Sequence, residues 1–253
     1  MAGDGRRARA VFKRMLQDDV APTPGSLSAL VDALSREGPG GAAEAERAVA
    51  RLGRGAAGAS NEVYHALIGA HGRCGDLPRA LEAMGRMRSA GLPVTAHTFT
   101  RVVGACGSDA GAALRTLEVA AKAGVPPALA TYNAALGVMA RGGASAAEVE
   151  AVERAMQRSG VAPDAITFNE LVACAAACGG GGAAARSVVE RMPAAGVAPN
   201  RVTYCRLVEA HAGDVAGAEA AADAMRRAGL GLTPQAAEAL VAVAAGAGDV
   251  EAA

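Results

Sequence analysis

The chain has 253 residues, and 51% of them are apolar although only 2% are aromatic. A core of large side chains around a single centre is therefore not expected, and the many Ala residues, which have the highest helix propensity, favour an all-α protein with closely approaching helices. The 25 basic and 25 acidic residues cancel, which argues against a protein that is held on nucleic acid mainly by charge.

The first 60 residues predict the end of one helical repeat and a degenerate second one. Residues 1–23 are predicted to form a partial repeat. Their Arg-rich start is compatible with a transit peptide, but Ala8 to Met15 already has the apolar spacing of a repeat helix, and we favour a chain that begins inside a repeat. Residues 24–60 are predicted as a full repeat with Leu27 at the position that an aromatic residue takes later.

From residue 61 onward, aromatic side chains recur at nearly constant distances. Tyr64, Phe99, Tyr132, Phe168 and Tyr204 are separated by 35, 33, 36 and 36 residues, which indicates an internal repeat. Each is followed by apolar residues three and four positions later, as on the buried face of a short helix. Buried packing is therefore favoured over base stacking as the role of these aromatics.

A second helix is predicted after each aromatic position, and a glycine ends it. Gly just beyond the last helical turn, often with Pro shortly after it, is an expected stop signal. These glycines are Gly91, Gly124, Gly160, Gly196 and Gly229. The predicted repeats are 61–95, 96–128, 129–164, 165–200 and 201–233, with a partial repeat at 234–253. Because one helix pair cannot bury its own apolar face, we expect an α-solenoid of stacked helix-turn-helix repeats of about 35 residues.

The repeats resemble those of the pentatricopeptide repeat family. The strings ATYNAALGVMARGG, AITFNELV and RVTYCRLV, with the endings AGLPVT, SGVAPD and AGVAPN, are similar to that family's VTYN start and G-[IV]-x-P-[DN] ending. The resemblance covers nearly the whole chain and is weakest in 24–60. A tetratricopeptide solenoid, which binds peptides, would have its aromatics and Pro at other offsets. The resemblance implies a right-handed α-solenoid that binds single-stranded RNA at one base per repeat, in a chloroplast or mitochondrion, without a cofactor.

The resemblance also implies that bases are specified by the residue directly after the aromatic and by the last residue of the repeat. Asn133 with Asp164 implies uracil, and Asn169 with Asn200 implies a pyrimidine. An amide has both a donor and an acceptor for the edge of a base, and the second residue would hold that amide in one orientation. The other pairs depart from the family's well-understood combinations. They are Ser28 with Ser60, His65 with Thr95, Thr100 with Ala128, and Cys205 with Thr233.

Two further sets of residues each have two interpretations. Two positions before the aromatic, the family has a small or branched apolar residue that wedges between bases, whereas ordinary core packing explains the same pattern. Nine positions after it, an Arg would reach a phosphate, whereas the helix macrodipole alone favours Arg at a helix C-terminus, which we prefer. The candidate wedge residues are Ala130, Ile166 and Val202, and the candidate phosphate-binding residues are Arg36, Arg73 and Arg141.

Several features that suggest chemistry are better explained by the repeats. Cys174 and Cys178 lie one helical turn apart but lack a third metal ligand, and five cysteines without a CxxC pair favour a reducing compartment. His71 and His211 share one offset from their aromatics. The four glycines from Gly179 lack the Lys-Ser/Thr of a phosphate loop. We expect no metal, no membrane span and, without the H-x-E and CxxC signature of zinc deaminases, no catalysis.

The leading hypothesis is a modular binder of organellar RNA that acts in RNA processing, stability or translation. One alternative is a protein-interaction scaffold without RNA specificity, which the zero net charge and the poorly readable pairs favour. The other is the RNA-docking array of a longer RNA-processing enzyme.

Overall fold

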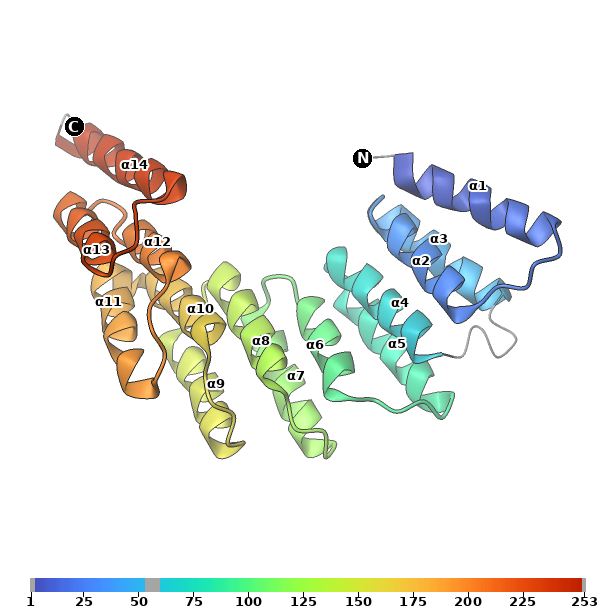
Figure 1. Ribbon diagram of the computed structural model, residues 1–253. Coiled ribbons are helices and arrows are strands. Elements are labelled where there is room, and N and C mark those ends of the chain that lie inside the picture. The colour runs from blue at the N-terminus through green and yellow to red at the C-terminus, as the bar shows by residue number, and fades with distance from the viewer. Residues whose placement is uncertain (1–2, 53–59, 252–253) are drawn as a thin grey trace. The chain divides into compact units, whose positions relative to one another are not determined.

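A computed structural model describes residues 3–52 and 60–251 of the chain. All regular elements in this part of the chain are helices (Figure 1). Residues 53–59, which fall within the predicted degenerate repeat, and residues 1–2 and 252–253 of the two predicted partial repeats lie outside the described residues. The chain divides into two compact units, Met1–Thr131 and Tyr132–Ala253.

The first unit consists of helix pairs that stack in chain order. Its helices are α1 (Gly3–Gln17), α2 (Pro24–Ser35), α3 (Pro39–Leu52), α4 (Asn61–Arg73), α5 (Leu77–Ser89), α6 (Ala96–Gly104) and α7 (Ala110–Lys122). The first helices of successive repeats, α2, α4 and α6, pack against one another in that order. Each of them also packs against the second helix of its own repeat, which is α3, α5 or α7.

The second unit continues the same plan. Its elements are α8 (Leu129–Gly142), which begins in the last residues of the first unit, α9 (Ala146–Arg158), α10 (Ala165–Ala175), the π turn η1 (Ala176–Gly180), α11 (Gly181–Arg191), the 3-10 turn η2 (Pro193–Ala195), α12 (Arg201–Ala210), α13 (Val215–Arg227) and α14 (Pro234–Glu251). Here α10, α12 and α14 pack against one another in order, and α10 and α12 pack against α11 and α13. The predicted all-α solenoid of tandem helix pairs is confirmed.

Several first helices begin at a side chain that caps the free N–H groups of the helix. Asp164 Oδ1 accepts the N–H of Thr167 at 2.8 Å, and Asn200 Oδ1 accepts the N–H of Thr203 at 3.1 Å. Ser60 caps α4 in the same way. Such caps satisfy donors that have no partner inside the helix. The last residue of each of these predicted repeats is thus the N-cap of the next first helix.

Four of the second helices, α5, α7, α9 and α13, end at the glycines that the sequence predicts as stops, and Gly196 ends the η2 turn that follows α11. At all five, φ lies between +66° and +74°, a left-handed conformation that Gly adopts without a steric penalty. The N–H after each glycine bonds to the carbonyl five residues earlier, as in Val161 to Met156 at 3.0 Å. This is the Schellman arrangement. The predicted stop glycines are confirmed.

The recurring aromatics belong to the packed interior. Phe99, Tyr132 and Phe168 are 1–3% exposed, and Tyr64 and Tyr204 are half-buried. The space between helices is otherwise filled largely by small side chains. Fully buried alanines include Ala45, Ala70, Ala80, Ala83, Ala113 and Ala135. The interpretation of the aromatics as packing residues is therefore confirmed for three of them and holds in part for Tyr64 and Tyr204.

One apolar helical run, Ala165–Ala195, is long and apolar enough to cross a bilayer when only length and composition are considered. Two glycines interrupt the run, Gly179 at φ +79° and Gly181 at φ +55°. It therefore folds into α10 and α11, of 11 residues each, which pack against each other. Each helix is shorter than the roughly 20 residues that a membrane span requires.

Candidate nucleic-acid interface

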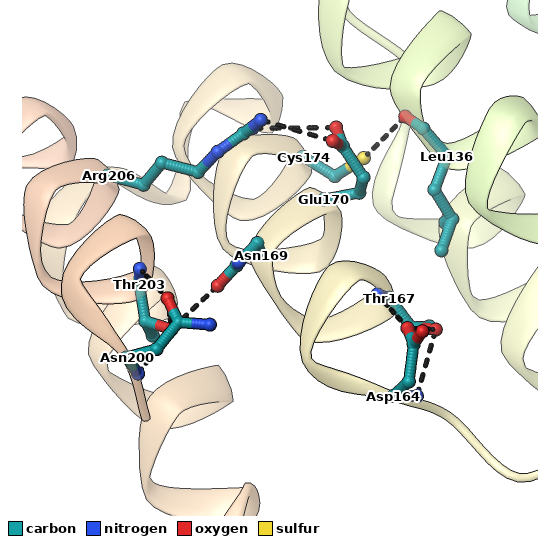
Figure 2. Close-up of polar contacts among 9 residues, drawn as sticks. All are labelled: Leu136, Asp164, Thr167, Asn169, Glu170, Cys174, Asn200, Thr203 and Arg206. Carbon is teal, nitrogen blue, oxygen red and sulfur yellow. Dashed lines mark hydrogen bonds and ion pairs between the residues drawn. The ribbon is translucent and has the colours of Figure 1, made fainter. Parts of the chain in front are cut away.

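The candidate base-specifying side chains occupy the same place in successive repeats. Each is the fifth residue of a first helix, such as Asn133 of α8 and Asn169 of α10. Each lies next to the N-terminus of the following first helix. Figure 2 shows Asn169 pointing from α10 toward Asn200 and Thr203 at the start of α12.

The predicted pair Asn133 and Asp164 is brought together. Asn133 Nδ2 donates to Asp164 Oδ1 at 3.2 Å. On its other side, the hydroxyl of Thr167 donates to Asn133 Oδ1 at 2.7 Å. The carboxylate and the hydroxyl therefore contact opposite ends of one amide. The amide is half-buried, so part of it stays accessible to solvent.

The predicted pair Asn169 and Asn200 is linked through a third residue. Thr203 Oγ1 donates to Asn169 Oδ1 at 2.6 Å. The same hydroxyl accepts the backbone N–H of Asn200 at 3.1 Å, and Asn200 Oδ1 accepts the N–H of Thr203. Asn169 is 6% exposed, so this amide lies deeper than that of Asn133.

The pairs His65 with Thr95 and Thr100 with Ala128 also involve an intermediate threonine. His65 Nε2 lies 3.0 Å from Thr98 Oγ1, which accepts the backbone N–H of Thr95 at 3.2 Å. Thr100 lies 2.7 Å from the hydroxyl of Thr131. Ala128 contributes a backbone carbonyl, which accepts the N–H of Thr131 at 2.9 Å.

The outermost pairs differ from the four just described. Ser28 donates to Glu62 at 2.6 Å, while Ser60 caps α4. Cys205 Sγ lies 3.2 Å from Thr233 Oγ1, so this predicted pair is in direct contact.

Sequence reasoning gave no role to the threonine that precedes the aromatic. Thr98, Thr131, Thr167 and Thr203 are all 0% exposed, and each contacts the base-specifying candidate of the preceding repeat. The signal was present, because Thr stands directly before Phe99, Tyr132, Phe168 and Tyr204. What the sequence could not supply was the contact, which joins residues 31 to 34 positions apart.

The carboxyl of Asp164 is held in its charged form. Burial raises its pKa, but the N–H and hydroxyl of Thr167 and the amide of Asn133 donate to it, and together they lower the pKa below its ordinary value of 3.8. Asp164 is therefore a carboxylate at neutral pH and acts only as an acceptor. This fixes which end of the Asn133 amide faces it.

The three candidate wedge residues lie on the surface. Ile166 is 56% exposed and Val202 is 50% exposed, and Ala130 is also exposed. Core packing therefore does not account for them. Ile166 precedes Asn169 by three residues, so both lie on one side of α10.

The three candidate phosphate-binding arginines lie at the ends of first helices, as the helix macrodipole favours. Arg73 donates to Asp32 Oδ1 at 3.0 Å and to the hydroxyl of Ser35. Arg36 is the C-cap of α2, and Arg141 is the penultimate residue of α8. Both are exposed.

The cysteines and histidines considered in the sequence are packed among the helices. The thiol of Cys174 donates to the carbonyl of Leu136 at 3.3 Å, and burial raises its pKa to about 12. All five cysteines are free thiols. His71 and His211 are buried. In the described part of the chain, no three His, Cys, Asp or Glu side chains are grouped so that they could hold a metal ion.

A largely apolar cavity of about 520 Å³ lies in the second unit, among α9, α10 and the end of α11. Its lining includes Met156, Phe168, Leu171 and Ala194. Arg191 and Glu153, which form an ion pair, also line it. Pro193 ends α11 early, and Ala194 stands where three of the four corresponding sites have a cation (Lys122, Arg158 and Arg227) and the fourth has Ser89. At Ala194 the cavity wall is therefore apolar, whereas three other repeats carry a positively charged side chain at the same position.

The chain is similar to known pentatricopeptide repeat proteins. Two crystal structures of the pentatricopeptide repeat protein PPR10 in complex with an 18-nucleotide psaJ RNA element are 20% identical to it, with a TM-score of 0.47, over 94% of this chain and 40% of that chain. A crystal structure of PPR10 from maize is 16% identical, with a TM-score of 0.35, over 99% of this chain and 51% of that one. The chain thus spans about half or less of the length of these proteins. No curated protein matches its sequence.

The family model described as the pentacotripeptide-repeat region of PRORP matches residues 59–252, which is more than half of the chain. With the stacked helix pairs, the threonine–aromatic starts and the glycine stops, this match shows that the chain belongs to the pentatricopeptide repeat family.

Proposed function

We propose that the chain binds single-stranded RNA and that successive repeats read successive bases. The observation that carries this proposal is the exposure of Ile166 and Val202, each three residues before a side chain that its neighbours hold in place. A base that packs its face on such an apolar side chain would present its edge to the residue one helical turn away. The arrangement occurs once in each of the repeats that begin with α10 and α12, and this spacing supports one base per repeat.

Asn133 and Asn169 are the reading side chains in this proposal. Asp164 supports Asn133 directly at 3.2 Å, and family resemblance implies uracil there. Asn200 supports Asn169 through Thr203, and the resemblance implies a pyrimidine. The array binds and does not catalyse in this proposal, and its targets are transcripts of a chloroplast or mitochondrion.

The test is selection from a randomised single-stranded RNA pool at low salt. We expect enrichment of two adjacent pyrimidines. Asn133→Thr and Asn169→Thr should each change the preference at one position and lower the affinity for the selected RNA about fivefold, the size of one lost hydrogen bond. Asn61→Thr makes the same chemical change on the exposed first residue of α4 and should leave the preference unchanged. A pool without any enrichment would exclude the proposal.

A second candidate function is a protein-interaction scaffold, which the apolar cavity near Ala194 favours. Ala194→Arg introduces the cation that three of the corresponding sites have and should block a partner's apolar side chain while leaving RNA selection unchanged. Comparison of the proteins cross-linked to the wild type and to this variant in organelle extract tests it. Identical cross-linked proteins would contradict this candidate.

The description of the family model as one region of PRORP favours a further candidate, in which the array docks RNA for a longer enzyme. Cleavage of a selected RNA by the complete gene product, and not by residues 1–253, is the expected result. Absence of cleavage by both would exclude it.

A further inference from the structure

Thr167 and Thr203, which are buried at the third position of α10 and α12, each form hydrogen bonds to two different repeats. Thr167 Oγ1 accepts the N–H of the N-cap residue Asp164 at 3.1 Å and also reaches back 2.7 Å to Asn133 Oδ1. Thr203 Oγ1 accepts the N–H of Asn200 at 3.1 Å and reaches back 2.6 Å to Asn169 Oδ1. Each hydroxyl thereby joins the start of one helix to the reading side chain of the preceding repeat.

We propose that Thr167 and Thr203 are positioning residues that decide which atom of the reading amide faces the RNA. The inference rests on the proposed function. The threonine hydroxyl occupies the amide oxygen, so the amide presents N–H groups to the base. Asn133 and Asn169 would therefore recognise an acceptor on the base edge, which both uracil and cytosine provide.

The hydrogen-bond donors and acceptors around the Asn133 amide support the orientation in which its oxygen faces Thr167. A hydroxyl has one proton and two lone pairs. Thr167 already accepts a backbone N–H, so its single proton lies between Asn133 Oδ1 at 2.7 Å and Asp164 Oδ1 at 2.9 Å, with the shorter contact to Asn133. Rotating the amide by half a turn would place its oxygen against the carboxylate of Asp164, which accepts and cannot donate. The carboxylate and the hydroxyl thus select the same orientation.

Asn169 depends on its threonine more strongly. Asn200 takes the place of a carboxylate, and its Oδ1 lies 3.3 Å from Thr203 Oγ1, farther than the 2.6 Å that separates Asn169 Oδ1 from the same hydroxyl. The orientation of the Asn169 amide is then set by one hydroxyl proton. Loss of the Thr203 hydroxyl should affect base preference more than loss of the Thr167 hydroxyl.

The chain contains repeats in which this position is not Thr, and their reading candidates have other partners. Val63 occupies it after Ser28, whose hydroxyl donates to Glu62 instead. Ala236 occupies it after Cys205, whose thiol contacts Thr233. Both reading amides, Asn133 and Asn169, stand before a repeat that has the threonine.

The first experiment measures the environment of the Asn169 amide by NMR in the absence of RNA. Side-chain NH₂ resonances of Asn169 in ¹⁵N-labelled protein are compared among the wild type, Thr203→Val and Thr203→Ser. We expect the pair to move and broaden in the Val variant, because the oxygen loses its donor, and to stay near its original position in the Ser variant. Thr116→Val is the matched control, since this buried hydroxyl bonds only within its own helix, to the carbonyl of Ala112 at 2.8 Å, apart from a weak contact to Cys106. An Asn169 pair that is the same in all four proteins would overturn the proposal.

The second experiment reads base preference with RNAs that differ at one position. Thr203→Val should reduce pyrimidine preference at the Asn169 position about fivefold, Thr167→Val should have a smaller effect at the Asn133 position, and Thr203→Ser should restore the preference. Equal preference in wild type and Thr203→Val would overturn the proposal.

A third variant keeps the threonine and changes the amide. In Asn169→Asp, Thr203 still donates to Oδ1, so the group facing the base becomes an acceptor and the preference should move to a base with a donor on that edge. This variant decides the question if Thr203→Val does not fold. If the wild type binds no RNA, the proposed function fails, and the amide resonances still decide whether the threonine positions Asn169.

Discussion

The imidazole of His211 shows how closely single residues are fitted in the second unit. It is 5% exposed, and its Nδ1 lies 2.9 Å from Asp214 Oδ2. Gly182 of α11 and Gly217 of α13 lie directly beside the ring, and a Cβ added to either would come within 2.1 Å of it. The histidine therefore joins neighbouring helices, and its neighbours must be glycines because a methyl group does not fit.

Gly217→Ala should destabilise the second unit by about 1–3 kcal/mol, the usual cost of forcing an extra methyl into a packed site. Urea unfolding followed by circular dichroism measures the change. Gly85→Ala, within α5 and without a neighbour within 4 Å of the added methyl, should instead stabilise by about 0.5–1 kcal/mol, because Ala is the better helix former. Equal effects of the two substitutions would contradict the packing argument.

Asp164 should give the second unit a pH-dependent stability. Because its pKa is lowered on folding, its contribution is complete above the ordinary value of 3.8 and is lost as the pH falls through the lower value of the folded state. The midpoint of urea unfolding should therefore fall between pH 7 and pH 3 by more in the wild type than in Asp164→Asn, which keeps a capping oxygen but does not titrate. The same fall in both proteins would show that another group is responsible.

At the level of helices, the break between α10 and α11 separates what the sequence could predict from what it could not. The glycine stops were predictable because the signal and its effect lie within six residues, as in Met156 to Val161. The early end of α11 at Pro193 is likewise a local effect. An apolar cavity lies beside this early end, and α9 and α10 also line it. The sequence could not predict the cavity, because its walls come from three helices.

The same limit applies to the candidate site. The pairing of Asn133 with Asp164 followed from family resemblance, but the threonine that connects to both did not, because its partner lies 34 residues away. The exposure of Ile166 depends on how neighbouring helices pack, and it argues against core packing as the role of this residue. Arg73 was predicted at the correct helix end, but its contact with Asp32, 41 residues earlier, was not.

Gly181→Ala should destabilise the α10–α11 pair by about 1–3 kcal/mol. Its φ of +55° and ψ of −153° lie in a region that is essentially restricted to Gly. Gly231→Ala has an open position at a φ that other residues adopt and should change stability by less than about 0.5 kcal/mol. The measurement is urea unfolding of both variants. A loss confined to Gly231→Ala would contradict the backbone argument.

At the scale of the whole molecule, several arginines form ion pairs with glutamates of other elements. Arg9 pairs with Glu37 and Glu44, Arg86 with Glu46, and Arg206 with Glu170, as Figure 2 shows for the last pair. These arginines are engaged by carboxylates of neighbouring helices and, at Glu37, of the turn between α2 and α3. If the chain binds RNA, little of the affinity should therefore come from phosphate neutralisation.

We expect a shallow dependence of RNA affinity on salt, with a slope of log K against log salt below about 2, because each neutralised phosphate on a single strand contributes about 0.7. Asp32→Asn removes the carboxylate partner of Arg73 and should steepen the slope by about 0.7 if Arg73 contacts a phosphate. Asp18→Asn makes the same charge change beside Arg14 of α1 and should not. Equal slopes for the two variants would exclude Arg73 as a phosphate contact.

The hydroxyl link between repeats has a consequence for recombination and for protein engineering. A segment such as 129–164, moved to a new context, keeps Asn133 and Asp164 but leaves Thr167 behind. Its amide would then be oriented by the residue of the recipient, which in this chain is Val63 or Ala236 at two such places. A graft of residues 132–167 would carry the complete set, so the transferable module is displaced by three residues from the repeat as read in the sequence.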